Sequence, residues 1–170
     1  MTKRRLPMIV PGIRMPPEGA ARAIYGQILA LSVLAAVSED ASYGTTDMLV
    51  AVVVTMLIFL SAHVYSEILA RRIDSDRALT VDEVRAALRS ELPLVVAAVP
   101  IAVVLLLGAA GTLSHDAAAN LALVVGVAGL AGWGLEISLR SRFGWWRSLL
   151  TVGINVALGL VIVGLKGLLH

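Results

Sequence analysis

Five polar side chains with possible proton or cation chemistry lie inside apolar stretches of the sequence: His63, Glu67, Glu136, Gln27 and Asn155. His63 and Glu67 are four residues apart, so a helix would place them on one face, one turn from each other. An imidazole beside a carboxylate can pass on a proton near neutral pH, and amides can hold water or an ion. Because titratable groups in membrane-grade segments are candidates for function, we interpret the five residues as a hypothetical ion or proton pathway.

A simpler interpretation of the same residues is local pairing. Glu67 precedes Arg71 by four residues, and Glu136 precedes Arg140 by four, which is the favourable order for an ion pair within a helix. The other three polar side chains could form hydrogen bonds between helices. The sequence leaves both interpretations open.

Metal and cofactor chemistry find little support in the residue types. The sequence contains no cysteine and three histidines, of which His63 alone falls in a long apolar stretch, while His115 and His170 are expected to be exposed to solvent. A facial site of two histidines and one carboxylate cannot be built from one histidine. We therefore predict neither a metal site nor a cofactor.

Enzyme and nucleic-acid functions are also disfavoured. Phosphate-binding loops, nucleophile elbows and zinc-protease motifs do not occur in the sequence. The basic residues are spread along the chain rather than gathered in one patch, so we expect no nucleic-acid partner. The question of catalysis stays open, with a non-catalytic protein favoured.

The composition indicates a protein surrounded by lipid. Of the 170 residues, 58% are hydrophobic and 15% are charged, whereas an ordinary soluble domain is roughly 45–50% apolar and about 25% charged. A spanning helix needs about 20 mostly apolar residues. We predict a cytoplasmic tail over residues 1–19 and a transmembrane domain over 20–170, with spans near 20–38, 47–70, 92–111, 116–139 and 146–168.

Basic residues set the expected orientation of these spans. Arginines occur before the first span, between the second and third, and between the fourth and fifth, whereas residues 39–47 and 111–116 contain neither Lys nor Arg. Because positive charges favour the cytoplasmic side, the N-terminus is predicted to lie inside and the C-terminus outside. The expected fold is an all-α polytopic bundle of about five spans.

The connection between the second and third spans has helical features of its own. Thr80 and Glu83 fit a capping box, and Val81, Val84 and Leu88 recur at helical spacing. We predict a cytoplasmic amphipathic helix near residues 80–91, which could be a simple elbow into the next span or a docking surface.

Two further patterns concern helix packing. The sequence Glu-Ile-x-x-Arg occurs at both Glu67 and Glu136, which hints at a degenerate repeat of two helix pairs. Small residues allow helices to approach closely in lipid, and the predicted packing positions are Gly126, Gly129, Gly132 and Gly153. Whether they pack within one chain or between chains is not readable from the sequence, although a homo-oligomer is favoured.

The segments "SAHVYSEILARR" and "DEVRAALRSELP", with the glycine-rich stretch near Gly126–Gly134, resemble small multi-pass membrane proteins of actinobacteria whose function is uncharacterised. The resemblance implies a location in the bacterial plasma membrane and implies no activity. Two functions are therefore considered: a proton- or cation-linked channel or transporter subunit, and a non-catalytic scaffold or accessory subunit of a membrane complex.

Overall fold

Five long helices form nearly all of the protein. The computed structural model describes residues 8–10, 13–15, 17–40, 42–73, 80–141 and 144–168. The helices are α1 (Pro17–Val37), α2 (Thr45–Ile73), α3 (Val81–Ala109), α4 (His115–Arg140) and α5 (Trp145–Leu168). Each is long and apolar enough to cross a membrane, so the predicted all-α polytopic fold is confirmed. Two short strands before α1, β1 (Met8–Val10) and β2 (Ile13–Met15), pair antiparallel and were not anticipated from the sequence.

The helix α3 differs most from the sequence-based expectation. Residues 81–91 do not form a separate amphipathic helix, because they are the first three turns of a single helix that continues to Ala109. The predicted capping box is present: the Thr80 hydroxyl accepts from the Glu83 amide at 3.3 Å, and the Glu83 carboxylate accepts from the Thr80 amide at 2.9 Å. This cap begins the helix well before Pro93, whose backbone φ is compatible with a helix although it lacks a donor.

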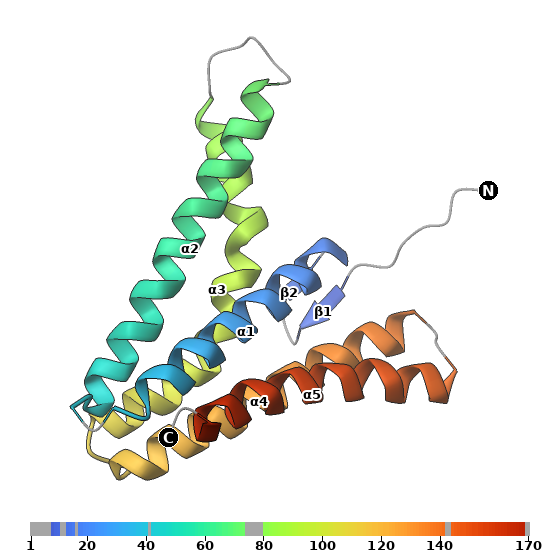
Figure 1. Ribbon diagram of the computed structural model, residues 1–170. Helices are drawn as coiled ribbons and strands as arrows, with labels where there is room; N and C mark the ends of the chain where they lie inside the picture. Colours follow the sequence, from blue (N-terminus) through green and yellow to red (C-terminus); the bar gives the residue numbers. More distant parts are fainter. Residues whose placement is uncertain are drawn as a thin grey trace.

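The helices are arranged as two hairpins with α1 between them. In Figure 1, α2 and α3 form one hairpin, α4 and α5 form the other, and α1 runs along the inside of both. The hairpins meet at one corner, where an added Cβ at Gly108 of α3 would lie 2.5 Å from the Ala118 side chain and 2.7 Å from that of Thr45. A hydrogen bond of 3.2 Å between Thr45 Oγ1 and His115 Nδ1 joins the first turns of α2 and α4.

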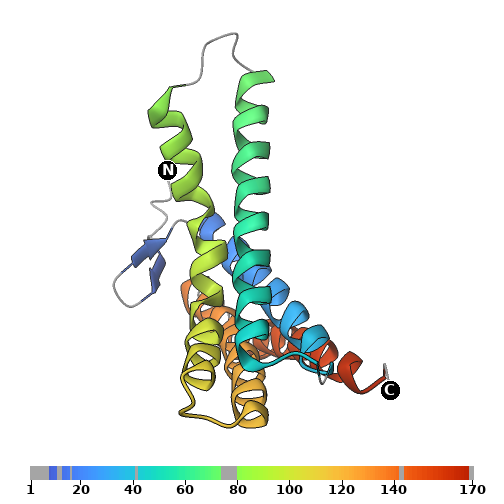
Figure 2. The same ribbon diagram turned by 90° about the vertical axis from the view of Figure 1, so that its left-hand side faces the viewer.

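From this corner the two hairpins diverge. Figures 1 and 2 show the C-terminal end of α2 and the C-terminal end of α4 pointing in different directions. The core lies where α1, α3 and α4 cross, and its fully buried side chains include Leu31, Leu34, Leu94, Ile101 and Leu105. By contrast, α2 and α5 expose most of their apolar surface, as expected for helices that face lipid.

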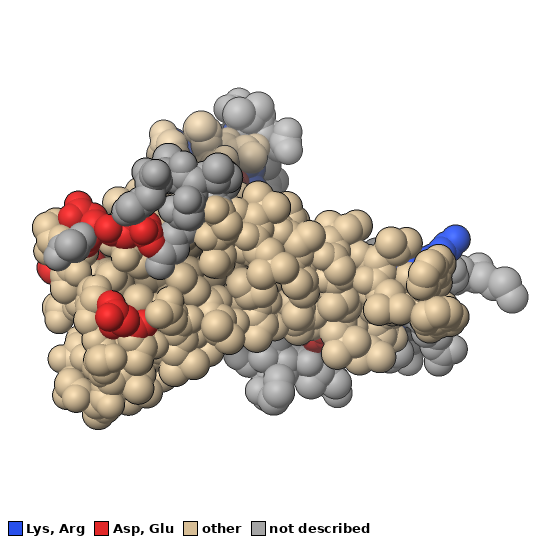
Figure 3. All heavy atoms as spheres, turned by 60° about the horizontal axis from the view of Figure 1, so that its bottom comes forward, with Lys and Arg blue, Asp and Glu red and all other residues tan. Residues whose placement is uncertain are grey.

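Most exposed charged side chains lie near the ends of the hairpins. Figure 3 shows acidic groups near the end where the hairpins meet, basic surface at the far end of the α4–α5 hairpin, and mostly uncharged residues on the face between them. The connection from α1 to α2 and the first turns of α2 and α4 supply exposed acids, including Asp40, Asp47 and Asp116. His115 is exposed, as expected, and His170 lies outside the described residues. This distribution fits a bundle whose middle is surrounded by hydrocarbon.

Candidate functional site

The five side chains of the hypothetical pathway do not form one cluster. Glu67 pairs with Arg71 of its own helix: the Arg71 Nε donates to Glu67 Oε1 at 3.0 Å, and Nη2 lies 2.9 Å from the same oxygen. Both side chains are partly exposed. Glu136 makes the equivalent pair within α4, where Arg140 Nη2 lies 2.8 Å from Glu136 Oε1. The two acids thus belong to the diverging ends of different hairpins (Figure 1).

Gln27 of α1 forms a hydrogen bond to α4. Its side chain is almost fully buried, and its Nε2 donates to the backbone carbonyl of Gly126 at 3.1 Å. An added Cβ at Gly129 would lie 2.5 Å from that same amide nitrogen. Because neither Gly126 nor Gly129 has a side chain, the Gln27 amide can lie directly against the backbone of α4.

Asn155 serves the interface between α4 and α5. Its Nδ2 donates to the Thr151 carbonyl of its own helix at 2.9 Å and would lie 3.1 Å from a Cβ added at Gly134. The predicted packing positions Gly132 and Gly153 have open space instead, since a Cβ added at either would meet no atom within 4 Å.

His63 reaches from α2 toward α1. Its Nδ1 lies 2.9 Å from the carbonyl oxygen of Phe59, and because a carbonyl can only accept, Nδ1 carries the proton and Nε2 carries the lone pair. The ring of Tyr25 on α1 packs against the imidazole with 5.6 Å between ring centres. The imidazole is therefore held between its own helix and α1.

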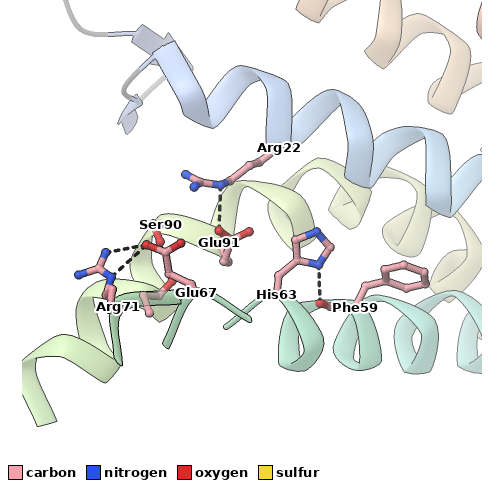
Figure 4. Close-up of polar contacts among 8 residues, drawn as sticks. Arg22, Phe59, His63, Glu67, Arg71, Ser90 and Glu91 are labelled. Carbon is pink, nitrogen blue, oxygen red and sulfur yellow. Dashed lines mark hydrogen bonds and ion pairs between the residues drawn. The ribbon is translucent and has the colours of Figure 1, made fainter. Parts of the chain in front are cut away.

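The most buried ion pair described was not anticipated from the sequence. Arg22 Nε on α1 lies 2.9 Å from Glu91 Oε1 on α3. Glu91 is only 3% exposed, and its other oxygen, Oε2, is buried without a hydrogen-bond partner among the described residues. Figure 4 shows Arg22 projecting from α1 toward Glu91, with His63 below the same segment of α1. An unsatisfied buried carboxylate oxygen is costly and calls for an explanation.

Arg22 and Tyr25 connect this ion pair to His63. They are three residues apart on α1 and so lie on adjacent turns of the same face, where Arg22 contacts α3 and Tyr25 contacts α2. His63 is 18 residues after Thr45, where α2 begins, and Glu91 is 18 residues before Ala109, where α3 ends. Each thus lies about 27 Å from that end at 1.5 Å per residue. We call Arg22, Tyr25, His63 and Glu91 the α1 polar cluster.

The sequence did contain one signal for Glu91. Ala87, Glu91, Leu94 and Ala98 recur at helical spacing, and all four are buried on the face of α3 that packs inward. The residue was instead assigned to a connection outside the membrane, because the helix was expected to begin near residue 92. Arg22 was interpreted only as a charge that marks the membrane edge.

The cluster offers one carboxylate oxygen rather than a metal site. The part of the chain that the structure describes holds no group of three His, Cys, Asp or Glu side chains that could bind a metal ion. The arrangement can bind and release a small positive charge at Glu91 Oε2, or it can serve only to join α1 to α3. Comparison of the chain with protein-family models, with curated proteins and with solved structures finds no match.

Proposed function

We propose that this protein is a small integral membrane protein of the bacterial plasma membrane that moves protons or cations, with Glu91 as the central binding group. The observation that carries the proposal is the fully buried carboxylate with one oxygen on Arg22 and one without a partner among the described residues. Ionisable groups kept inside a membrane bundle are expensive and commonly mark ion pathways. We therefore propose Glu91, rather than Glu67, as the acid that binds the transported charge.

A purely structural ion pair explains less of this geometry. A pair that only joins two helices is most stable when both carboxylate oxygens are satisfied, yet only Oε1 has a partner among the described residues. The local pairs of Glu67 and Glu136 are more exposed than this one, so neither acid is held in a comparably closed environment. Glu91 is therefore the acid whose environment favours exchange of a bound charge.

Reconstitution in liposomes tests the proposal. Fluxes of H⁺, Na⁺ and K⁺ would be measured for the wild type, for E91Q and for E136Q, which makes the same chemical change in an ion pair within one helix. We expect flux above that of protein-free liposomes, at least about tenfold slower flux in E91Q, and a near-normal rate in E136Q.

Two outcomes would contradict the proposal: a wild type no more permeable than empty liposomes, or an E91Q variant as active as the wild type. Circular dichroism and gel filtration in detergent would establish that E91Q is folded. If it is not, E91D keeps the carboxylate and should show a reduced but measurable flux.

A second candidate is a non-catalytic scaffold or accessory subunit that binds another membrane protein or a second copy of itself. The observation in its favour is the open space at Gly132 and Gly153, two small residues whose packing is not used within the described part of the chain. Small residues support close helix association in lipid. The mass of the assembly in nanodiscs tests this function, because G153L should shift an oligomer toward the monomer whereas a native monomer would be unaffected.

A further inference from the structure

The geometry of the α1 polar cluster bears on which charge Glu91 binds, a proton or a metal cation. We infer that Glu91 Oε2 binds a proton and not a metal cation, and that His63 Nε2 is the second group through which this proton passes. This inference rests on the proposed function, since it names the charge that the same site would carry. Three properties of the cluster support it: the number of oxygen ligands, the position of Arg22 and the titratable nitrogen of His63.

The described residues around Glu91 do not supply the set of acidic or imidazole side chains typical of a divalent metal site. Ions such as Mg²⁺ and Ca²⁺ take six or more oxygen ligands, and the described residues provide no group of three suitable side chains. Transporters often complete sodium sites with carbonyl groups from unwound helix segments. Here α1, α2 and α3 continue as helices past the cluster on both sides, so no unwound segment adjoins it, although Pro93 leaves the Arg89 carbonyl without its usual helical donor.

The charge of Arg22 also opposes a metal cation. Its Nε lies 2.9 Å from Glu91 Oε1, so any cation at Oε2 would approach a guanidinium charge within the same buried site, where screening by water is weak. A proton adds the same single charge as a monovalent cation, but it forms a covalent O–H bond with Oε2 and needs no further ligand. The site then needs only one free oxygen, which is what the structure provides.

Protonation would release Arg22. Once Glu91 is neutral, the bond from Arg22 Nε to Oε1 is no longer between two charges and becomes weaker. The Arg22 side chain is 27% exposed, so its charged end can move toward the membrane surface while its stem stays on the apolar helix. Binding of one proton thus raises the charge of the site by one, and that charge resides on an arginine able to reach water.

We assign the exchange of this proton to His63, which lies on the same side of α1 as Glu91 in Figure 4. Its Nδ1 is engaged by the Phe59 carbonyl, which leaves the lone pair of Nε2 as the place where a proton can bind. Within the cluster, the Tyr25 ring packs against the imidazole, and Glu67 and Arg71 lie one and two turns further along α2. Figure 4 shows His63 and Glu91 on the same side of α1, coming from α2 and α3.

The experiment measures proton binding and ion selectivity on the full chain. Infrared difference spectra between pH 5 and pH 8 would detect a protonated carboxyl in the wild type, and that band should be lost in E91Q but kept in E136Q. Its intensity should be the same in NaCl and KCl. In liposomes, Glu91-dependent flux should occur for H⁺ alone, and H63Q should slow it at least about threefold near neutral pH.

The outcomes separate this inference from the function on which it rests. Flux of Na⁺ or K⁺ that depends on Glu91, or a carboxylate band that changes with the metal salt, would overturn the proton assignment while leaving transport intact. No flux of any of the three ions in the wild type would instead contradict the proposed function. If H63Q matches the wild type at every pH while E91Q is inactive, the role of His63 is wrong.

If E91Q does not fold, E91D replaces it. The carboxyl band of E91D should persist with a shifted pH midpoint, and an unshifted band would contradict the assignment of the band to residue 91.

Discussion

The carbonyl oxygen of Leu94 occupies the place that a side chain at position 26 would need, so Gly26 allows α1 and α3 to touch backbone to backbone. Gly26 lies one turn after Arg22, and Leu94 lies one turn after Glu91. The close crossing therefore sits directly beside the Arg22–Glu91 ion pair. It fixes the separation of the two helices, and through it the distance between the two charged groups.

Replacing Gly26 by alanine should destabilise the protein. An added Cβ would overlap the Leu94 carbonyl group, whose backbone cannot yield as a flexible side chain can. Overpacking of this kind costs about 1–3 kcal/mol, and we expect a lower midpoint of thermal unfolding in detergent. Gly132→Ala is the matched control, because a Cβ at that position meets no atom within 4 Å. Equal midpoints for the two variants would contradict the close crossing.

Replacing Gln27 by methionine should weaken the contact between α1 and α4. Methionine has a similar length but cannot donate the 3.1 Å hydrogen bond to the Gly126 carbonyl. Hydrogen bonds between membrane helices contribute about 0.6 kcal/mol on average and up to ~1.7 kcal/mol. Urea or SDS unfolding should show a loss of about 1 kcal/mol.

Ser32→Ala provides the comparison for Gln27→Met. Ser32 is exposed and its hydroxyl donates to Ile28 of the same helix, so its loss should change the free energy of unfolding very little. If Gln27→Met proves as stable as Ser32→Ala, the buried amide does not hold α1 and α4 together.

Asp40 should titrate at a lower pH than an ordinary aspartate. Both the hydroxyl of Ser42, at 2.6 Å, and its amide, at 2.9 Å, donate to Asp40 Oδ1. These hydrogen bonds favour the charged form and lower the pKa of Asp40 below its ordinary value of 3.8. A lowered pKa in the folded state stabilises the fold above the unfolded pKa, and this contribution is lost as the pH falls through the folded pKa.

A carboxyl NMR titration tests the position of Asp40. Ser42→Ala removes the hydroxyl donor, which is the larger cause of the shift, so the pKa of Asp40 should rise toward 3.8. The variant should be less stable than the wild type above the unfolded pKa, and this difference should vanish as the pH falls through the folded pKa. Identical titration curves would mean that the turn at Asp40 is not formed in solution.

Much of the fold could be predicted from the sequence because lipid imposes a simple rule on it. Every backbone polar group in hydrocarbon must be satisfied, so each long apolar stretch is a helix, and all five helices are present. The pairs at Glu67 and Glu136 follow from spacing along one helix, and both occur. Such local features need no knowledge of how helices are arranged.

The ion pair between Arg22 and Glu91 depends on that arrangement and was therefore missed. The residues are far apart in the sequence and meet only because α1 crosses α3 at Gly26. The apolar pattern alone also placed the start of α3 near residue 92, although the capping box at Thr80 indicated an earlier helix. The divergence of the two hairpins, which keeps Glu136 away from Glu67, likewise has no signature in local spacing.

The last prediction concerns the orientation of the bundle. Arginines flank the N-terminus of α1, the α2–α3 connection and the α4–α5 connection, whereas the other two connections contain neither Lys nor Arg. The positive-inside rule therefore predicts that Ser42 lies outside the cell and that Thr80 and Ser141 lie inside. The chain contains no cysteine, so single cysteines can be introduced without altering native thiols. In intact cells a membrane-impermeant maleimide should label Ser42→Cys, and it should label Thr80→Cys and Ser141→Cys only after permeabilisation. Labelling of Ser42→Cys and Thr80→Cys from the same side would mean that α2 does not cross the membrane.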